Sequence, residues 1–118
     1  MFEALIIDDN LEARTMFKKA LYRLGCNVHE AETAEKGISQ LAMMSFHIVF
    51  AALCVRNIGA RGIARWVKNN CPDTKFLIIT SWKGQLEHHI LEIEGIHGVI
   101  HKPLLFAEIR DVLLDHLG

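Results

Sequence analysis

Four polar side chains follow short apolar runs in this chain and together suit the handling of a phosphoryl group. Asp8 and Asp9 come directly after one run, Thr80 comes after a second, and Lys102 comes after a third. Paired carboxylates suit a hard divalent cation such as Mg²⁺, which takes oxygen ligands. A lysine can neutralise phosphoryl oxygens, and a threonine hydroxyl can hydrogen-bond one of them. The set predicts an acidic phosphoryl-transfer site.

The residue that such a site would use as its nucleophile is missing. The apolar run at residues 47–53 should be a buried strand that leads into a loop, and Ala52 stands near its end. A carboxylate at that position would act as the nucleophile of an aspartyl-phosphate site. Between Asp9 and Asp73 the chain contains no aspartate at all. Ala52 therefore removes the expected acceptor and leaves the rest of the site.

The elements that must position these residues alternate along the chain. Five apolar strand-like runs alternate with five helical patterns, without a linker, a repeat or a low-complexity tract, so we expect a single domain over residues 1–118. The runs lie at residues 4–7, 27–31, 47–53, 76–79 and 99–100.

Capping residues and apolar spacing define the helices. The first helix should cover residues 11–24 and end at Gly25, where a left-handed residue is favourable. Thr33 should cap the second helix, Pro72 should follow the third, which starts after a loop at 57–60, and Pro103 should open the last. The inward face expected for the second helix is Ala34, Ile38, Leu41 and Ala42. For the fourth helix it is Leu86, Ile90 and Ile93. For the fifth helix it is Leu105, Ile109, Val112 and Leu113.

Strands that alternate with helices predict a parallel sheet with right-handed crossovers. The first, third and fourth runs are the densest in apolar residues and should be central. We therefore predict an α/β fold, a doubly wound, flavodoxin-like (βα)₅ unit with strand order 2-1-3-4-5 and helices on both faces. The polar residues should then converge at the carboxyl ends of the strands.

Composition excludes several classes of function. Thirteen basic and fourteen acidic residues give a formal charge of −1, which provides no basic surface for nucleic acid or a membrane. No apolar run approaches the roughly 20 residues that span a bilayer, and no signal peptide is evident. Three cysteines without a CxxC pair favour a reducing, cytoplasmic location. No Ser or Cys follows a strand beside an evident His, so we do not expect an enzyme.

The segments at residues 5–10, 79–81 and 100–103 resemble the receiver domain of two-component response regulators, and the spacing matches from Phe2 to Leu117. The resemblance implies that an acidic pair and a third-strand aspartate bind Mg²⁺, and that this aspartate accepts a phosphoryl group from a histidine kinase. A threonine and a lysine then transmit the effect of phosphorylation to the face made by helix 4, strand 5 and helix 5. It also implies a cis peptide bond before Pro103.

Carried over to this chain, the resemblance makes Asp8 and Asp9 the metal pair, Thr80 the switch hydroxyl and Lys102 the salt-bridging lysine. Ala52 occupies the acceptor position. Further departures from the family pattern surround the same region: His47, Val55, Arg56 and Val99 replace an acidic residue, a Met-Pro pair and an aromatic switch residue.

These departures indicate a degenerate receiver that acts as a phosphorylation-independent protein-interaction module in a bacterial two-component system. Its partner would be a sensor kinase, an output domain or a regulator. No cofactor is required, and Mg²⁺ binding would be weakened. The alternative is a functioning receiver that accepts the phosphoryl group on Asp8 or Asp9. With one carboxylate gone, Lys102 should be held by one of these two acids.

Three apolar residues, Leu91, Leu104 and Phe106, fall near the face made by helix 4, strand 5 and helix 5. They could serve a protein partner or a homodimer there. The alternative is that they close the edge of the core.

The charge balance at the site gives a stability prediction. Two carboxylates and one lysine sum to −1, whereas an aspartate at position 52 would make the sum −2. A like-charge pair about 4 Å apart costs up to about 4 kcal/mol at an effective dielectric of about 20, so the relief from losing one acid should exceed about 1 kcal/mol after screening. We expect Ala52→Asp to lower the melting temperature without Mg²⁺ and to regain it with Mg²⁺. Identical calorimetric melting curves for both proteins, with and without the ion, would contradict this.

Overall fold

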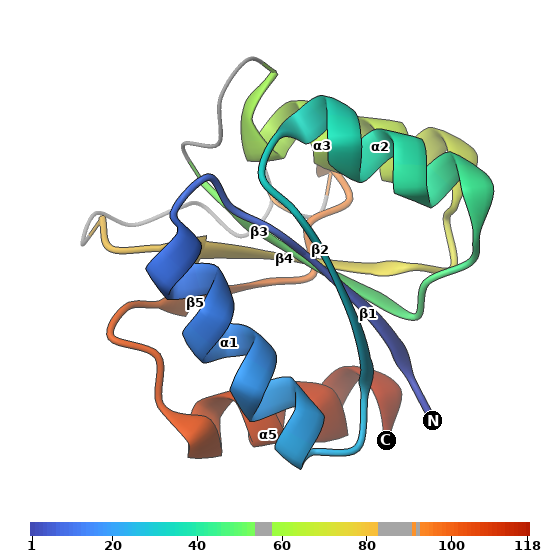
Figure 1. Cartoon of the computed structure of the whole chain (residues 1–118). Coiled ribbons are helices and arrows are strands. Elements are labelled where there is room, and N and C mark those ends of the chain that lie inside the picture. The colour runs from blue at the N-terminus through green and yellow to red at the C-terminus, as the bar shows by residue number, and fades with distance from the viewer. Residues whose placement is uncertain (54–57, 83–90, 92) are drawn as a thin grey trace.

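The computed structural model describes residues 1–53, 58–82, 91 and 93–118 (Figure 1). Most of the expected fourth helix, including Leu86 and Ile90, lies outside the described residues, as do Val55 and Arg56.

Five parallel strands form one sheet in the order β2-β1-β3-β4-β5, which confirms the predicted topology. The strands are β1 (Glu3–Ile7), β2 (Asn27–Ala31), β3 (Ile48–Ala52), β4 (Lys75–Thr80) and β5 (Gly98–His101). Parallel strands all end at the same edge of the sheet, so the residues that follow them are brought together whatever their separation in sequence.

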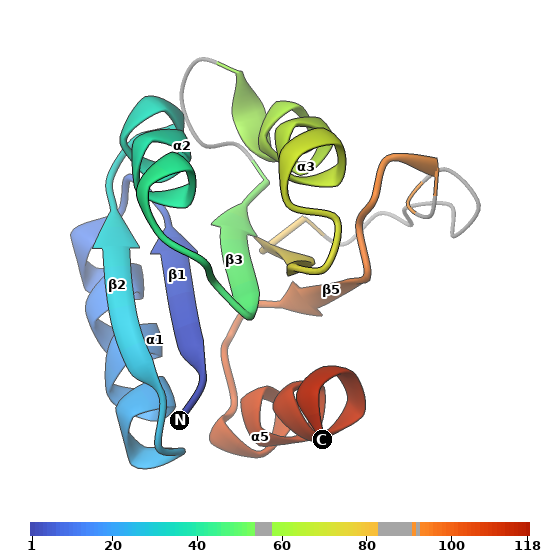
Figure 2. The same cartoon turned by 90° about the vertical axis from the view of Figure 1, so that its right-hand side faces the viewer.

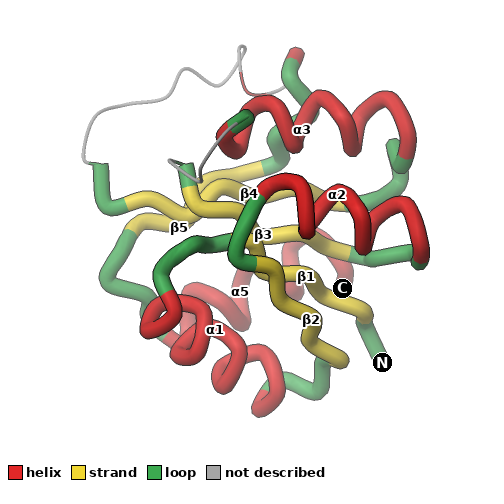
Figure 3. The backbone as a smooth tube through the Cα atoms, turned by 45° about the horizontal axis from the view of Figure 1, so that its top comes forward, coloured by secondary structure: helices red, strands yellow, loops and turns green. Residues whose placement is uncertain are grey.

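Helices cover both faces of the sheet, as expected for a doubly wound fold. Helices α1 (Leu11–Arg23) and α5 (Phe106–Leu117) lie on one face, and α2 (Ala34–Met43) and α3 (Gly59–Asn70) lie on the other (Figures 1, 2 and 3).

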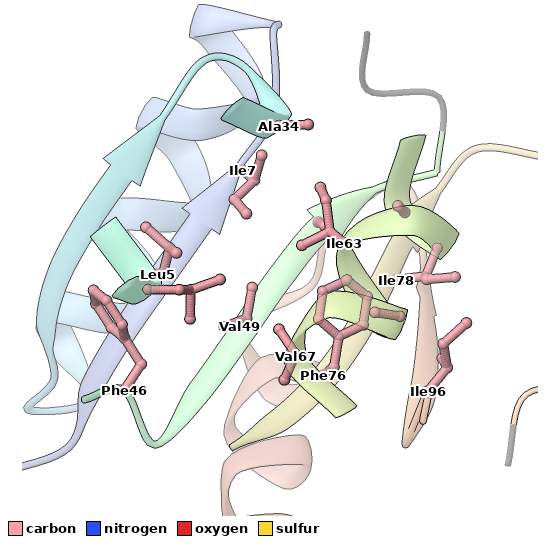
Figure 4. Close-up of a cluster of buried hydrophobic side chains, with 14 of the residues drawn as sticks. Leu5, Ile7, Ala34, Phe46, Val49, Ile63, Val67, Phe76, Ile78 and Ile96 are labelled. Atoms are coloured by element: carbon pink, nitrogen blue, oxygen red, sulfur yellow. The ribbon is translucent and has the colours of Figure 1, made fainter. Parts of the chain in front are cut away.

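Alternation along the strands divides the core into two layers. In β1, Leu5 and Ile7 face the α2–α3 layer, whereas Ala4 and Ile6 face the α1–α5 layer. Figure 4 shows the first layer, where side chains of β1, β3 and β4 meet those of α2 and α3. In the second layer the ring centroids of Phe17 in α1 and Phe50 in β3 lie 4.6 Å apart. Because both faces of the central strands are buried, their register is firmly set.

The expected helix ends are largely present. The Thr33 side chain accepts a hydrogen bond from the Lys36 N–H at 3.1 Å and caps α2. Gly25 has φ of 85° and follows the last turn of α1, in the left-handed conformation that glycine adopts at low cost. Asn10 caps the start of α1 through a 2.8 Å bond from the Ala13 N–H. This cap fixes the direction of α1 immediately after Asp8.

Two helix starts differ from the prediction. Helix α5 begins at Phe106 rather than at Pro103, because the backbone of Leu105 is extended and its carbonyl accepts the first helical hydrogen bonds. As a result Leu105 is exposed rather than inward. Helix α3 begins at Gly59, within the segment expected to be a loop.

The inward face of α2 also differs from the prediction. Its buried residues are Ala34, Gly37 and Leu41, while Ala42 is exposed and Ile38 is half-buried. Spacings of three and four place these buried residues on one stripe. A glycine carries no side chain, so an apolar pattern does not count it, although here it allows α2 to approach Ile7 of β1.

This close approach makes Gly37 sensitive to substitution. An alanine Cβ would lie 2.9 Å from Ile7 Cγ1 and nearer still to its Cδ1. Alanine improves helix propensity by about 1 kcal/mol, whereas overpacking costs about 1–3 kcal/mol. We expect Gly37→Ala to lower the free energy of unfolding in urea by about 1 kcal/mol. In an Ile7→Val background, which lacks Cδ1, Gly37→Ala should lower the free energy of unfolding by less than it does in the native chain. A single Gly37→Ala variant more stable than the native chain would contradict the close contact.

Candidate functional site

The carboxyl ends of β1, β3, β4 and β5 converge on a shallow, open pocket. In the ladder Ala52 of β3 is opposite Ile79 of β4, and the Lys102 N–H donates to the Thr80 carbonyl at 2.8 Å. The pocket is lined by Asp8, Asp9, Asn10, Ala52, Leu53, Ile79, Thr80, Ser81 and Lys102. The structure therefore brings together all five residues that the sequence analysis selected for the site.

Asp8 is held in the pocket through both its carboxylate and its backbone. It is only 3% exposed, and one carboxylate oxygen accepts the Asn10 N–H at 2.9 Å. The other oxygen lies 3.6 Å from Nζ of Lys102. The backbone is fixed as well, since the Asp8 N–H donates to the Ala31 carbonyl at 3.1 Å. This carboxylate therefore has a single well-defined position.

Lys102 faces Asp8 rather than solvent, as the sequence analysis expected. Its side chain is 31% exposed, so the pair is partly screened from water. The 3.6 Å separation is longer than a charge-assisted hydrogen bond, and the contact is an ion pair. The Lys102–Pro103 peptide bond is cis, as the resemblance implies.

Sequence reasoning missed an ion-pair network that supports the loop after β1. The buried guanidinium of Arg14 donates to the Asp8 carbonyl at 2.7 Å and to the Glu30 carboxylate at 3.1 Å. Lys18 Nζ lies 2.8 Å from the same carboxylate. Hydrogen bonds from Lys18 and then Arg14 lower the pKa of Glu30. The available signal was the position of Arg14 on the inward stripe of α1 with Phe17, where an arginine needs buried partners.

Thr80 is oriented by the backbone that follows it. Its hydroxyl is nearly buried and accepts the Trp82 N–H at 3.0 Å, which leaves the hydroxyl hydrogen available to donate. The Trp82 side chain is half-exposed.

The oxygen ligands present fit only part of a Mg²⁺ site. Asp8 and Asp9 offer two carboxylates at one strand end, and Mg²⁺ in proteins is commonly bound through one or two carboxylates and several waters. Ala52 contributes a methyl group where a third ligand would stand. Within the described part of the chain, no three His, Cys, Asp or Glu side chains are grouped so as to hold a metal ion.

The three apolar residues expected at an interaction face do not lie together on it. Leu91 is 8% exposed and belongs to the core on the α2–α3 side of the sheet. Leu104 and Phe106 instead line a groove against α1, and the guanidinium of Arg23 lies 4.8 Å from the Phe106 ring centroid. Of the three residues, Leu91 is buried in the core, and Phe106 is an exposed apolar side chain at 36%.

Comparison with protein families assigns the chain to a class. The model of the response regulator receiver domain matches residues 4–114, and the chain belongs to this family. Receiver domains serve two-component signalling, generally bind Mg²⁺ at the phosphorylation site, and interact with kinases and output domains.

Solved structures show the same fold at low sequence identity. The chemotaxis response regulator CheY4 of Vibrio cholerae is 17% identical, with a TM-score of 0.89 over 98% of each chain. A CheY-like receiver domain protein from Methanospirillum hungatei is 19% identical, with a TM-score of 0.90 over 99% of this chain and 94% of that one. NtrX from Brucella abortus, solved with ATP, is 18% identical with a TM-score of 0.87, and the match covers 98% of this chain and 27% of that chain.

The Asp8–Lys102 pair should be energetically coupled. Removing Lys102 leaves a nearly buried carboxylate without its cation, whereas removing both charges does not. We expect a double-mutant cycle of Lys102→Met and Asp8→Asn, measured by urea unfolding without Mg²⁺, to give a coupling of about 0.5–1.5 kcal/mol after allowance for the exposure of Lys102. Additive effects of the two substitutions would show that the ion pair contributes nothing to stability.

Proposed function

We propose that this receiver domain is not phosphorylated at the usual position and acts as a phosphorylation-independent protein-interaction module. One observation carries the proposal. The residue at the end of β3, in the pocket that holds Asp8, Asp9, Thr80 and Lys102, is Ala52. An alanine has no atom that can attack a phosphorus centre.

The charge arrangement supports a fixed rather than a switching domain. Lys102 has Asp8 as its counter-ion, and with no acid at position 52 there is no second carboxylate at the end of β3 to draw it away. A switch needs two states that a ligand or modification favours differently. Without an acceptor, the domain would keep the state in which Lys102 pairs with Asp8.

The proposed partner is a protein of the same signalling system: a sensor kinase, an output domain or a regulator. The near-neutral composition offers no basic surface for nucleic acid. None of the helices within residues 1–53, 58–82, 91 and 93–118 is long and apolar enough to cross a membrane. We propose a cytoplasmic location, no catalytic activity, no required cofactor and, at most, weak binding of Mg²⁺ by Asp8 and Asp9.

Intact-mass spectrometry tests the proposal. The native chain and Ala52→Asp are incubated with acetyl phosphate and Mg²⁺, with a sample lacking the phosphodonor as the control. We expect only Ala52→Asp to gain a phosphoryl group, because the rest of the site is present.

Phosphorylation of the native chain would overturn the proposal and favour a receiver that uses another acid. Asp9 would then be mapped first, because it is exposed, whereas Asp8 is buried and doubly engaged. Asp9→Asn should abolish the modification in that case.

A further inference from the structure

The side chain of His97 completes the hydrogen bonding between β4 and β5. The His97 backbone N–H donates to the Phe76 carbonyl at 2.7 Å, and Nδ1 of the His97 ring accepts the Phe76 N–H at 3.0 Å. Because β5 begins only at Gly98, the ring nitrogen takes the place of the carbonyl that a longer strand would offer. Phe76 is fully buried, so its N–H needs an acceptor, and the imidazole supplies it.

The same arrangement occurs at the start of β3. The His47 backbone N–H donates to the Glu3 carbonyl at 2.9 Å, and Nδ1 of the His47 ring accepts the Glu3 N–H at 2.9 Å. That contact is exposed, whereas the contact between His97 and Phe76 is partly buried. A donor that loses its acceptor away from water costs more than one that water can reach. The loss of the ring contact is therefore more costly at His97.

The last turn of α5 packs against the junction of β4 and β5. The ring centroids of His97 and His116 lie 6.3 Å apart in an edge-to-face arrangement. A Cβ placed on Gly98 would lie 3.7 Å from Nε2 of His116, which puts this second ring over the start of β5. Ile100 of β5 and Leu113 of α5 also belong to one core layer. Apolar packing and two imidazoles thus join α5 to this end of β5.

A positive charge on His97 is incompatible with this geometry. An imidazole that accepts a hydrogen bond at Nδ1 is neutral and carries its proton on Nε2, whereas a charged imidazole is a donor at both nitrogens. When His97 takes up a proton from solvent, Nδ1 becomes a donor that faces the Phe76 N–H. The ring must then turn away, and the buried N–H loses its acceptor.

Most of the influences on His97 favour its neutral form. Partial desolvation of the ring, then Lys75 of β4 and then His116 lower the pKa of His97. The smallest influence, that of the Phe76 backbone, acts in the opposite sense, and the Phe76 carbonyl is already bonded to the His97 N–H. Asp115, next to His116 on α5, is exposed to solvent, where its charge is screened.

The charged groups of α3 at the turn before β5 have other partners. Glu94, the acidic residue closest to His97 in sequence, forms a two-pronged ion pair with Arg61 at 2.6 and 2.7 Å. Lys68 extends over the same turn, and its ammonium donates to the Ile93 carbonyl. The carboxylate of Glu94 is therefore engaged by α3 rather than by the His97 ring.

We propose that His97 and His116 form an acid-sensitive latch at the amino-terminal edge of the sheet. While His97 is neutral, the latch holds the start of β5 to β4 and the last turn of α5 to β5. Proton uptake opens it, because the His97 ring leaves the Phe76 N–H and, once His116 is also charged, the two rings repel each other. The pocket of Asp8 and Ala52 lies at the opposite edge, so the latch acts on β5 and α5 without using that pocket.

The response is expected on the acid side of about pH 6.5, where histidine titrates in an unfolded chain. Because folding lowers the pKa of His97, its contribution to stability is complete above that pH and is lost as the pH falls through the folded-state pKa. One excluded proton lowers the folding equilibrium constant by at most about tenfold per pH unit. His97 is solvent-exposed as a residue, which limits the effect, so we expect about a two- to fivefold fall between pH 7 and pH 5.5.

Urea unfolding at pH 7 and at pH 5.5 tests the latch, with His97→Asn as the main variant. The side-chain amide oxygen of an asparagine can accept the Phe76 N–H at both pH values, because it does not titrate. Between these pH values the folding equilibrium constant of the native chain should fall about two to five times more than that of His97→Asn. His101→Asn is the matched control, because it removes an exposed histidine from the same strand, and it should keep the native pH dependence.

Two NMR measurements locate the effect. Amide hydrogen exchange, corrected for the intrinsic rate, should show that acid lowers the protection of the Phe76 N–H more than that of the Ile6 N–H in β1. His116→Gln should raise the midpoint at which the His97 ring titrates, because the second positive charge is gone.

Any of four results would overturn the proposal. Equal pH dependence of stability in the native chain and in His97→Asn would show that His97 does not couple proton uptake to folding. A His97 ring that titrates at or above the midpoint of histidine in the urea-unfolded chain would show that the folded domain tolerates the charged ring. Equal loss of protection at Phe76 and Ile6 would show that acid unfolds the whole domain. An unchanged His97 midpoint in His116→Gln would show that the two rings do not act together.

Discussion

The burial of the Asp8 carboxylate at the end of β1 is the constraint on which the rest of the site depends. A nearly buried carboxylate is costly unless its charge and its oxygens have partners, and here the Asn10 N–H bonds one oxygen while the Lys102 ammonium forms an ion pair with the other. Lys102 directly follows β5, which runs parallel to β4, so it lies at the same edge of the sheet as the other pocket residues. The Arg14 guanidinium donates a hydrogen bond to the Asp8 carbonyl and so holds the loop that follows β1. Through its carboxylate and its backbone groups, Asp8 thus connects the end of β1 to α1, to β2 and to the residue that follows β5.

In the proposed function, Ala52 is the substitution that keeps the fold of a receiver domain but removes phosphoryl transfer at the end of β3. The fold, the Asp8–Lys102 pair and the Thr80 hydroxyl do not require a carboxylate at the end of β3, so they persist without it. Compared with an aspartate, the methyl group at position 52 leaves the site with one less negative charge and with no carboxylate at the end of β3. Under the proposed function, Thr80 and Lys102 hold one conformation instead of responding to a phosphoryl group, and the domain presents a constant surface to its partner.

Much of the fold could be predicted because its determinants are local or periodic. Apolar runs, helical spacing and the caps at Thr33 and Gly25 gave the element order, and the density of the runs indicated which strands are central. Strand-end residues of a parallel sheet must converge, so the grouping of Asp8, Thr80 and Lys102 followed. Gly37 was missed because its contribution is the absence of a side chain. The role of Arg14 was missed because its partner, Glu30, lies on β2 and is distant in sequence. The start of α5 was missed because the conformation of Leu105 depends on tertiary context.

Backbone amide ¹H–¹⁵N spectra would test most directly whether the scaffold persists without the switch. Mg²⁺ is added first and acetyl phosphate second, to the native chain and to Ala52→Asp. The account predicts that Mg²⁺ shifts in the native chain stay near Asp8 and Asp9, and that the phosphodonor adds no change at Thr80, Lys102 or α5. In Ala52→Asp the phosphodonor should shift all three. Phosphodonor-dependent shifts at Thr80, Lys102 and α5 in the native chain would contradict the account.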